Sequence, residues 1–278
     1  MPVDTRKQWA GELQADYRVS VVMSCQVVCI SRTAYYYRKR QVDDSDVIHA
    51  LLALAERYPR WGFPKYFKRL RTLGHRWNHK RVHRVYTALK LQLRSKRKQR
   101  LPARQPMPLA QPRSPQQCWS MDFMSDSLAS KRKFRTLNVI DDFNREVLGI
   151  DIATSIASAR VTRYLDSLAF KHGYPERIRV DNGIEFTSHE FMRWATERGV
   201  YIDFIEPGSP YQNAYIERFN RTYREDVLDS YLFNNLEEVR YLTKEWVTAY
   251  NTERPHDSLN DMSPMEYKKW GNSTNELC

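Results

Sequence analysis

The chain has 278 residues and a formal net charge of +12, a balance that points to a polyanionic partner. Its longest uncharged stretch, residues 19–31, is too short to span a membrane, and the N-terminus lacks the apolar segment of a secretory signal. The four cysteines form no disulfide or zinc framework, so we expect a soluble protein of a reducing, cytoplasmic compartment.

The positive charge is concentrated in the first 115 residues, which carry 25 Lys and Arg against 7 acidic residues, a net charge of +18. The remainder carries 20 Lys and Arg against 26 acidic residues, a net charge of −6. We therefore expect affinity for DNA to reside mainly in the front part. The acidic remainder needs cations before it can approach phosphates.

The front part divides into an N-terminal helical extension, residues 1–40, and a second helical domain, residues 44–92. In the extension, Ser20 and Ser31 stand at the N-cap positions of two short helices, 20–29 and 31–37. The domain 44–92 has a pattern of three helices. The first opens at Asp44 or Ser45, the second has Pro64 in its first turn and ends near Gly74, and the third is capped by Asn78.

Apolar spacing predicts which faces of these three helices are buried. The expected core residues are Ile48, Leu51, Leu52 and Ala55 in the first helix, Phe67 and Leu70 in the second, and Val82, Val85, Tyr86 and Leu89 in the third. The other face of the third helix carries Lys80, Arg81 and Arg84. This arrangement is similar to a helix-turn-helix module with a basic recognition helix, and an ordinary solvated helix is the alternative. Whether such a helix reads bases or only grips the backbone stays open.

Histidines 75, 79 and 83 recur at four-residue spacing, which raises the question of a zinc site. Gly74 and Asn78 place a helix start between the first and the second of them, and no Cys-x-x-Cys follows. We therefore do not interpret them as metal ligands.

Residues 93–115 form a basic, proline-rich linker. Seven basic residues lie between 90 and 104, Arg97 among them, and five prolines lie between 102 and 115. Such a segment could follow the DNA backbone, in which case Arg97 binds DNA, or it could be a plain solvated linker.

The region 116–271 begins with a strand whose two faces differ. Alternation with a period of two places Trp119, Met121 and Phe123 on one face and leaves Ser120 and Asp122 on the other. Further strands are predicted at 137–140, 147–152, 178–180 and 201–205, and helices at 159–172, 188–198, 217–228 and from 235 onward.

Two more carboxylates occupy distinctive positions in this region. Asp181 follows a strand and precedes the turn signal Asn182-Gly183, at a strand end where functional residues of open sheets tend to lie. Glu217 lies on a helix, and Arg221 and Arg224 share its face four and seven residues later, where they could hold substrate phosphates. Each residue alone is typical of a solvated surface charge.

Taken together, Asp122, Asp181 and Glu217 are suited to bind divalent cations. Mg²⁺ prefers oxygen ligands and keeps several of its waters. A pair of such ions can activate the attacking oxygen and stabilise the leaving oxygen of a phosphodiester displacement. His or Cys clusters would instead indicate zinc or a softer metal.

Five blocks, in order, carry a resemblance to a known family: Trp119-Ser-Met-Asp122-Phe, Val139-Ile-Asp-Asp-Phe-Asn-Arg-Glu146, Arg177-Ile-Arg-Val-Asp-Asn-Gly183, Gln212-Asn-Ala-Tyr-Ile-Glu217 and Tyr250-Asn-Thr-Glu-Arg-Pro-His256. Residues from about 115 to 270 resemble the retroviral-integrase-like core of bacterial insertion-sequence transposases, specifically the second-frame (OrfB-type) protein of family three. Residues 58–89 resemble the small helical domain that precedes this core. Departures are Ile184, Arg218 and Arg221, none of which removes a metal ligand.

The resemblance implies an α/β fold with an RNase H-like mixed sheet flanked by helices, preceded by an all-α helix-turn-helix-like domain. It implies that Asp122, Asp181 and Glu217 are the catalytic residues and hold Mg²⁺ or Mn²⁺, with two ions expected. It implies cleavage and transfer of DNA strands at element ends and target, by a homo-oligomer on DNA.

The resemblance also implies a partner from an upstream frame, with another helix-turn-helix and a leucine zipper, paired with this chain or fused to it by a frameshift. No sustained heptad series appears in this chain, so we expect it to bind DNA ends weakly on its own. Two alternatives remain: an RNase H-like nuclease without strand transfer, and a non-catalytic DNA-binding remnant of a mobile element. Arg254 and His256 are interpreted as packing residues.

Overall fold

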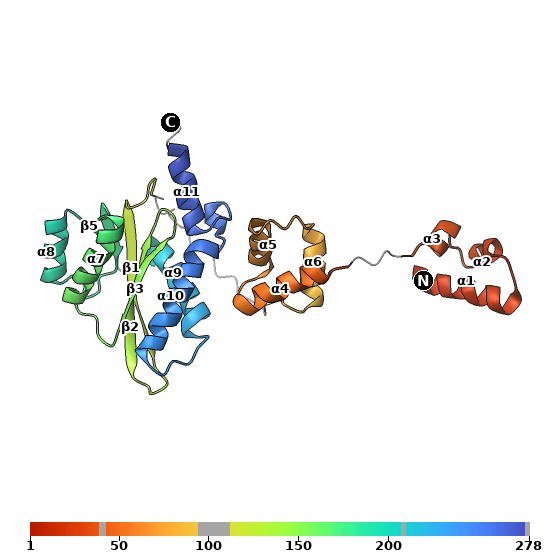
Figure 1. Cartoon of the computed structure of the whole chain (residues 1–278), viewed down its shortest axis with the longest axis horizontal. Coiled ribbons are helices and arrows are strands. Elements are labelled where there is room, and N and C mark those ends of the chain that lie inside the picture. The colour runs from red at the N-terminus through yellow and green to blue at the C-terminus, as the bar shows by residue number, and fades with distance from the viewer. Residues whose placement is uncertain (39–42, 94–111, 207–209, 276–278) are drawn as a thin grey trace. The chain divides into compact units, whose positions relative to one another are not determined.

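The computed structural model describes residues 1–38, 43–93, 112–206 and 210–275. The chain forms two compact units, Met1–Asp46 and Val47–Cys278, which are considered one at a time (Figure 1). No helix in the described ranges is both long and apolar enough to cross a membrane.

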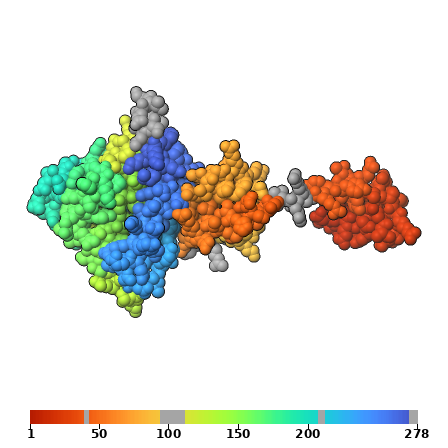
Figure 2. Space-filling model, viewed as in Figure 1, coloured from red at the N-terminus to blue at the C-terminus, as the bar shows by residue number. Residues whose placement is uncertain are grey.

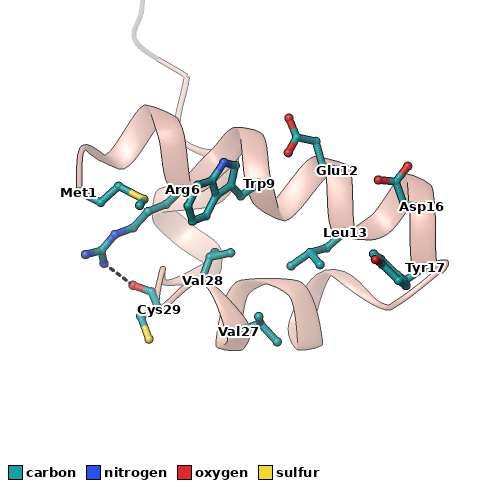
Figure 3. A pocket seen from close by; sticks show the side chains of 10 residues that line it. All are labelled: Met1, Arg6, Trp9, Glu12, Leu13, Asp16, Tyr17, Val27, Val28 and Cys29. Atoms are coloured by element: carbon teal, nitrogen blue, oxygen red, sulfur yellow. Dashed lines mark hydrogen bonds between the residues drawn. The ribbon is translucent and has the colours of Figure 1, made fainter.

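The first unit consists of three helices, α1 (Val3–Tyr17), α2 (Val21–Val27) and α3 (Arg32–Tyr36). The hydroxyls of Ser20 and Ser31 accept hydrogen bonds from backbone N–H groups in the first turns of α2 and α3, which confirms both predicted caps. Helix α1 was not predicted, because its sequence has no periodic apolar face and it buries only Ala10. Figure 3 shows the shallow groove that results, in which Trp9 and Leu13 of α1 lie near Val27 and Val28.

The second unit begins with the helices α4 (Ser45–Arg57), α5 (Phe63–Thr72) and α6 (His79–Ala88). The Asn78 side chain caps α6 by accepting from the N–H of Lys80, and Val82, Val85 and Tyr86 are buried as predicted. The predicted face of α4 was wrong in part. Its buried residues are Val47, Leu51 and Leu54, while Leu52 is exposed. In α5 the fully buried aromatic residue is Tyr66, whereas Phe67 is only partly covered.

A five-stranded mixed sheet forms the centre of the remaining residues. Its strands are β1 (Cys118–Ser127), β2 (Lys133–Asp141), β3 (Val147–Ala153), β4 (Arg177–Val180) and β5 (Tyr201–Phe204), in the order β3-β2-β1-β4-β5. Strands β1, β2 and β3 pair antiparallel, while β4 is parallel to β1 and β5 is parallel to β4. The sheet predicted from sequence is confirmed, and its strands are longer at both ends of β1 and β2.

Helices cover both faces of this sheet (Figure 1). On one face, α7 (Ser158–His172) and α8 (His189–Arg198) pack on the side chains of Trp119, Met121 and Ile178 in a wholly apolar cluster. On the other, α9 (Ala214–Tyr223) and α10 (Leu236–Glu253) pack on a second apolar cluster. In the space-filling view, α10 and α11 (Pro264–Asn275), in blue, cover this side (Figure 2).

Helix α9 does not continue as a regular α-helix to residue 228, as predicted, but passes into a π-helical turn, Arg224–Leu228. Within this turn, the Asp226 carboxylate accepts hydrogen bonds from Arg254, at 2.7 Å, and from the indole N–H of Trp246, at 3.2 Å. These contacts come from residues on and after α10, so the widened turn reflects tertiary packing that no local pattern encodes.

Candidate active site

Asp122 lies in the middle of β1, on the face that points toward α9. Its Oδ1 accepts a hydrogen bond from the backbone N–H of Phe123 at 2.7 Å, and its Oδ2 accepts one from the side-chain amide of Asn220 at 2.7 Å. Partial burial and the negative charges of Asp181 and Glu217 raise its pKa to about 6, while the two hydrogen bonds oppose that shift. The charges of Asp181 and Glu217 therefore both act on the carboxyl group of Asp122.

Asn220 connects the sheet to the helix that carries Glu217. Its Oδ1 accepts a hydrogen bond from the Asn138 amide on β2, at 2.7 Å, so the chain Asn138–Asn220–Asp122 spans two strands and α9. Asn220 is 8% exposed and Asn138 is fully buried. Sequence reasoning missed this role, although Asn220 lies one helical turn after Glu217 and its spacing was a usable signal.

Asp181 directly follows β4, which runs parallel to β1. Its Oδ1 accepts a hydrogen bond from the N–H of Gly183 at 3.0 Å, which closes a tight turn. A Cβ at position 183 would stand 2.9 Å from this same oxygen, so glycine is required for the close approach. The local sequence thus aims the carboxylate beyond the strand end.

Glu217 lies in the first turn of α9 and is exposed. Partial burial raises the pKa of its carboxyl group, and Arg221 opposes the shift. In the described ranges, no group of three or more His, Cys, Asp or Glu side chains is arranged so that it could hold a metal ion. Asp181 and Glu217 thus influence Asp122, but the three side chains are not drawn together as metal ligands in this structure.

The other predicted DNA-binding residues are in different situations. Arg224 is held by the backbone carbonyl of Ser125, at 2.9 Å, and by the carboxylate of Asp126, at 3.4 Å. Arg221 is exposed on α9, and Lys80 and Arg84 are exposed on α6, where Arg81 is half-buried. Arg97 lies outside the described residues.

A buried ion network lies on the same face of the sheet as Asp122. Arg179 on β4 is 8% exposed and contacts two carboxylates, those of Asp142 and Asp203, each at 3.1 Å. Asp142 is fully buried. Burial raises the pKa of its carboxyl group, while Ser120 and Arg179 oppose the shift. This network links β4, which Asp181 follows, to the turn after β2 and to β5.

Comparison with known proteins agrees with this architecture. Models of the integrase core domain match residues 112–210 and 198–264, and a model of an HTH-like domain matches residues 41–99. The cryo-EM structure of a simian T-cell lymphotropic virus intasome, in complex with PP2A regulatory subunit B56 gamma, is similar in fold, with a TM-score of 0.52. It is 16% identical and covers 72% of this chain and 73% of that one. The fold is therefore an integrase-type core preceded by a helix-turn-helix-like domain.

Two insertion-element proteins are similar over most of the chain. An uncharacterized 39.2 kDa protein of insertion element IS476, from Xanthomonas euvesicatoria, is 36% identical over 245 residues, 88% of this chain and 71% of that protein. An uncharacterized 31.7 kDa protein of insertion element IS407, from Burkholderia multivorans, is 35% identical over 250 residues, 90% of each. The chain belongs to the bacterial insertion-sequence transposases of family three, of the second-frame type. It is a DNA transposase, an enzyme that cleaves and transfers DNA strands.

Proposed function

We propose that Asp122, Asp181 and Glu217 are the catalytic carboxylates and that they hold divalent metal ions, Mg²⁺ or Mn²⁺, at the reacting phosphodiester. The single observation that carries this proposal is the hydrogen bond from Asn220 to Asp122, because it holds α9, with Glu217, against β1. Asp181 reaches the same region from the end of β4, which pairs with β1.

The donor set fits such ions. Three carboxylates supply hard, negatively charged oxygens, as Mg²⁺ and Mn²⁺ prefer. Burial and the charges of Asp181 and Glu217 raise the pKa of Asp122, and bound positive charge would favour its ionised form. Two ions held there would polarise the scissile phosphate and lower the pKa of an attacking hydroxyl.

The chain's own residues would fix the geometry of the reaction. Asn220 and the backbone N–H of Phe123 each occupy one lone pair of Asp122, which sets the direction of the others. In the first step, a water oxygen attacks the phosphorus at the element end, and the bond to the 3′ oxygen breaks to leave a 3′ hydroxyl. In the second, that hydroxyl attacks a target phosphodiester, and the leaving 3′ oxygen takes up the proton.

The test is nicking and joining of element-end DNA in Mg²⁺ or Mn²⁺, comparing wild type with Glu217→Gln. The substitution keeps the shape of the side chain and removes its charge. We expect a loss greater than the roughly 10- to 100-fold typical of residues that only orient metal ligands. Glu225→Gln, an exposed carboxylate in the π-helical turn that follows α9, is the matched control and should retain activity. Equal activity of Glu217→Gln and Glu225→Gln would refute the proposed role.

The products of the same assay distinguish the alternatives. Joined strands require a transposase, whereas nicked strands alone would indicate a nuclease without strand transfer. Binding of DNA without either product, in wild type and variant, would indicate a non-catalytic remnant.

We also propose that the chain acts on DNA as a homo-oligomer and together with an upstream-frame protein that carries a helix-turn-helix and a leucine zipper. The family resemblance and the positive charge of the first 115 residues support this proposal. Alone, the chain should bind element ends weakly, and the added partner should increase end-specific affinity. Tight, end-specific binding by this chain alone would contradict it.

A further inference from the structure

A second group of cations lies on the face of α9 next to the one that carries Glu217. Tyr215, Arg218 and Thr222 recur at helical spacing and line a pocket of about 400 Å³. Its other walls are the turn between β2 and β3, which contributes Arg145, and the residues at and after the end of α10. Lys65 on α5 and Ile140 on β2 also line the pocket.

Arg145 is the most unusual residue of this pocket. It is 7% exposed, and its backbone adopts the left-handed conformation, with φ of 61°, which is uncommon for a residue with a side chain. Its guanidinium carbon lies 3.4 Å from the centre of the Tyr215 ring. Its Nη1 atom is buried and has no hydrogen-bond partner in the described ranges. A buried charged donor without a partner is costly, so the arrangement favours a ligand that supplies an acceptor.

The remaining charges leave the pocket positive. Arg254 pairs with Asp226 at 2.7 Å, and the lining residue Asp257 pairs with Lys68 on α5. Arg218 has no ion pair in the part of the chain that the structure describes. His256 adds a second buried nitrogen, Nε2, without a hydrogen-bond partner. Burial and the surrounding cations, Arg254, Arg145 and Arg218 among them, lower the pKa of His256, so it is neutral at pH 7.

The chemistry of this lining selects an oxyanion. Guanidinium groups present paired donors that match the oxygens of a phosphate, and the hydroxyls of Tyr250 and Ser258 in the same lining can donate further hydrogen bonds. The location selects the source of the phosphate. Arg218 follows Glu217 directly in α9, so the pocket and the carboxylates proposed to act on DNA share this helix, on neighbouring faces.

We propose that this pocket, formed around Arg145, Arg218 and Arg254, binds a backbone phosphate of the DNA and anchors the strand next to the catalytic carboxylates. The proposal rests on the function proposed above. It gives a role to Arg145 and to the Arg-Pro-His block, which the three-carboxylate mechanism leaves without one.

The experiment measures the salt dependence of DNA binding by the full chain, using fluorescence anisotropy with a duplex that carries the element end. Each phosphate contact contributes about 0.9 to the slope of log K against log salt concentration. We expect Arg218→Gln and Arg145→Gln each to reduce the slope by about that amount. The double variant should reduce it no further, because both residues hold the same phosphate.

Arg163→Gln is the matched control. It removes one positive charge from an exposed position on α7, which packs on the opposite face of the sheet, and it should leave the slope unchanged. Since Arg145 is buried, thermal unfolding should confirm that its variant is folded. Arg218 is exposed, so its variant tests the proposal without that concern.

A second measurement locates the phosphate. Duplexes that carry a neutral methylphosphonate at single positions should include one that weakens wild-type binding and leaves Arg218→Gln binding unchanged. Slopes of Arg218→Gln and Arg145→Gln equal to that of Arg163→Gln would overturn the proposal. So would calorimetric binding of inorganic phosphate that Arg218→Gln abolishes while DNA binding is unaffected, since the pocket would then serve a small anion. These failures differ from failure of the proposed function, in which Glu217→Gln nicks and joins DNA as well as wild type.

Discussion

The two faces of the sheet are built by the same strands, yet they differ in chemistry. Toward α7 and α8, the strands present mainly apolar side chains, such as Trp119, Met121 and Ile178, with Asp151 on β3, which pairs with Arg160 on α7, as a polar exception. Toward α9, the middle of the sheet presents polar ones, including Ser120, Asp122 and Arg179, and apolar packing resumes on the side of β2 and β3. The alternation of a β-strand makes this separation possible, because adjacent residues point to opposite faces.

This difference indicates where the protein tolerates change. The apolar face gains stability from burial. The stability lost on mutation there depends on the side-chain volume removed and on the cavity that is left. The polar face depends on paired groups, because a buried polar group that loses its hydrogen-bond or ion-pair partner destabilises the fold. Substitutions on the first face should therefore change stability alone, and those on the second should change stability and catalysis together.

The largest effect on stability should come from Arg179→Met. The substitution leaves Asp142 buried without its cation, and breaking one partner of a buried ion pair costs about 3–5 kcal/mol. Urea unfolding measures the change. Arg193→Met, which removes an exposed arginine paired with an exposed glutamate on α8, should cost less than about 0.5 kcal/mol. Equal effects of the two substitutions would show that the buried network is dispensable. Adding Asp142→Asn to Arg179→Met should recover part of the loss, because the stranded charge is removed.

A smaller effect on stability but a specific effect on catalysis should come from Asn220→Ala. The change leaves Asp122 and Asn138 without a shared partner, at a cost of about 1–3 kcal/mol. Strand transfer should fall about 10- to 100-fold, as is typical when a group that orients a metal ligand is removed.

Leu165→Ala on α7 provides the comparison from the apolar face. It should cost about 2–5 kcal/mol in the same unfolding assay and leave strand transfer per folded molecule unchanged. If Leu165→Ala lowered transfer as much as Asn220→Ala does, the separation of the two faces into structural and functional roles would be wrong.

Much of the fold could be predicted from the sequence because its signals are local. Ser20, Ser31, Asn78 and Ser188 all cap helices as short-range rules require, and the period of two along β1 places Asp122 on the α9 side. Helix α1 was not predicted, and the predicted buried face of α4 was wrong in part, for the same reason. Their apolar residues are too few or too evenly spread for one face to dominate, so tertiary packing decides which are buried.

The residues of the candidate site divide in the same way, into those with a local sequence signal and those without one. The three carboxylates lie in recognisable local contexts, a strand, a strand end and a helix, and their assignment as catalytic remains a proposal. Asn138, Arg145 and His256 could not be assigned from sequence, because their environments consist of residues far away in the chain. Arg145 illustrates this, since its pocket joins a turn at residues 142–146 to α9 and to the segment after α10. The interpretation of Arg254 and His256 as packing residues overlooked the buried nitrogen of His256 that lacks a partner.

The last prediction is a difference in the pH dependence of stability between wild type and His256→Gln. Burial, together with nearby cations, lowers the pKa of His256 from 6.5 to about 3 in the folded protein. The unfolded chain therefore takes up a proton between pH 6.5 and 3 that the folded chain does not. As pH falls through this window, wild type should lose stability relative to His256→Gln by up to about 1.4 kcal/mol per pH unit.

Urea unfolding from pH 7 to pH 4, in buffer without phosphate so that the proposed anion pocket is not occupied, measures this difference. Carboxylates that titrate in the same range contribute to both proteins, and the subtraction removes them. If wild type loses stability relative to His256→Gln as the pH falls, His256 is neutral in the folded state. It then belongs with the buried polar groups of the molecule, whose stability depends on their partners. If the free energies of unfolding of the two proteins stay parallel with pH, the pKa of His256 does not change on folding. The imidazole is then as well solvated in the folded chain as in the unfolded one, and the cations around it have no effect on it.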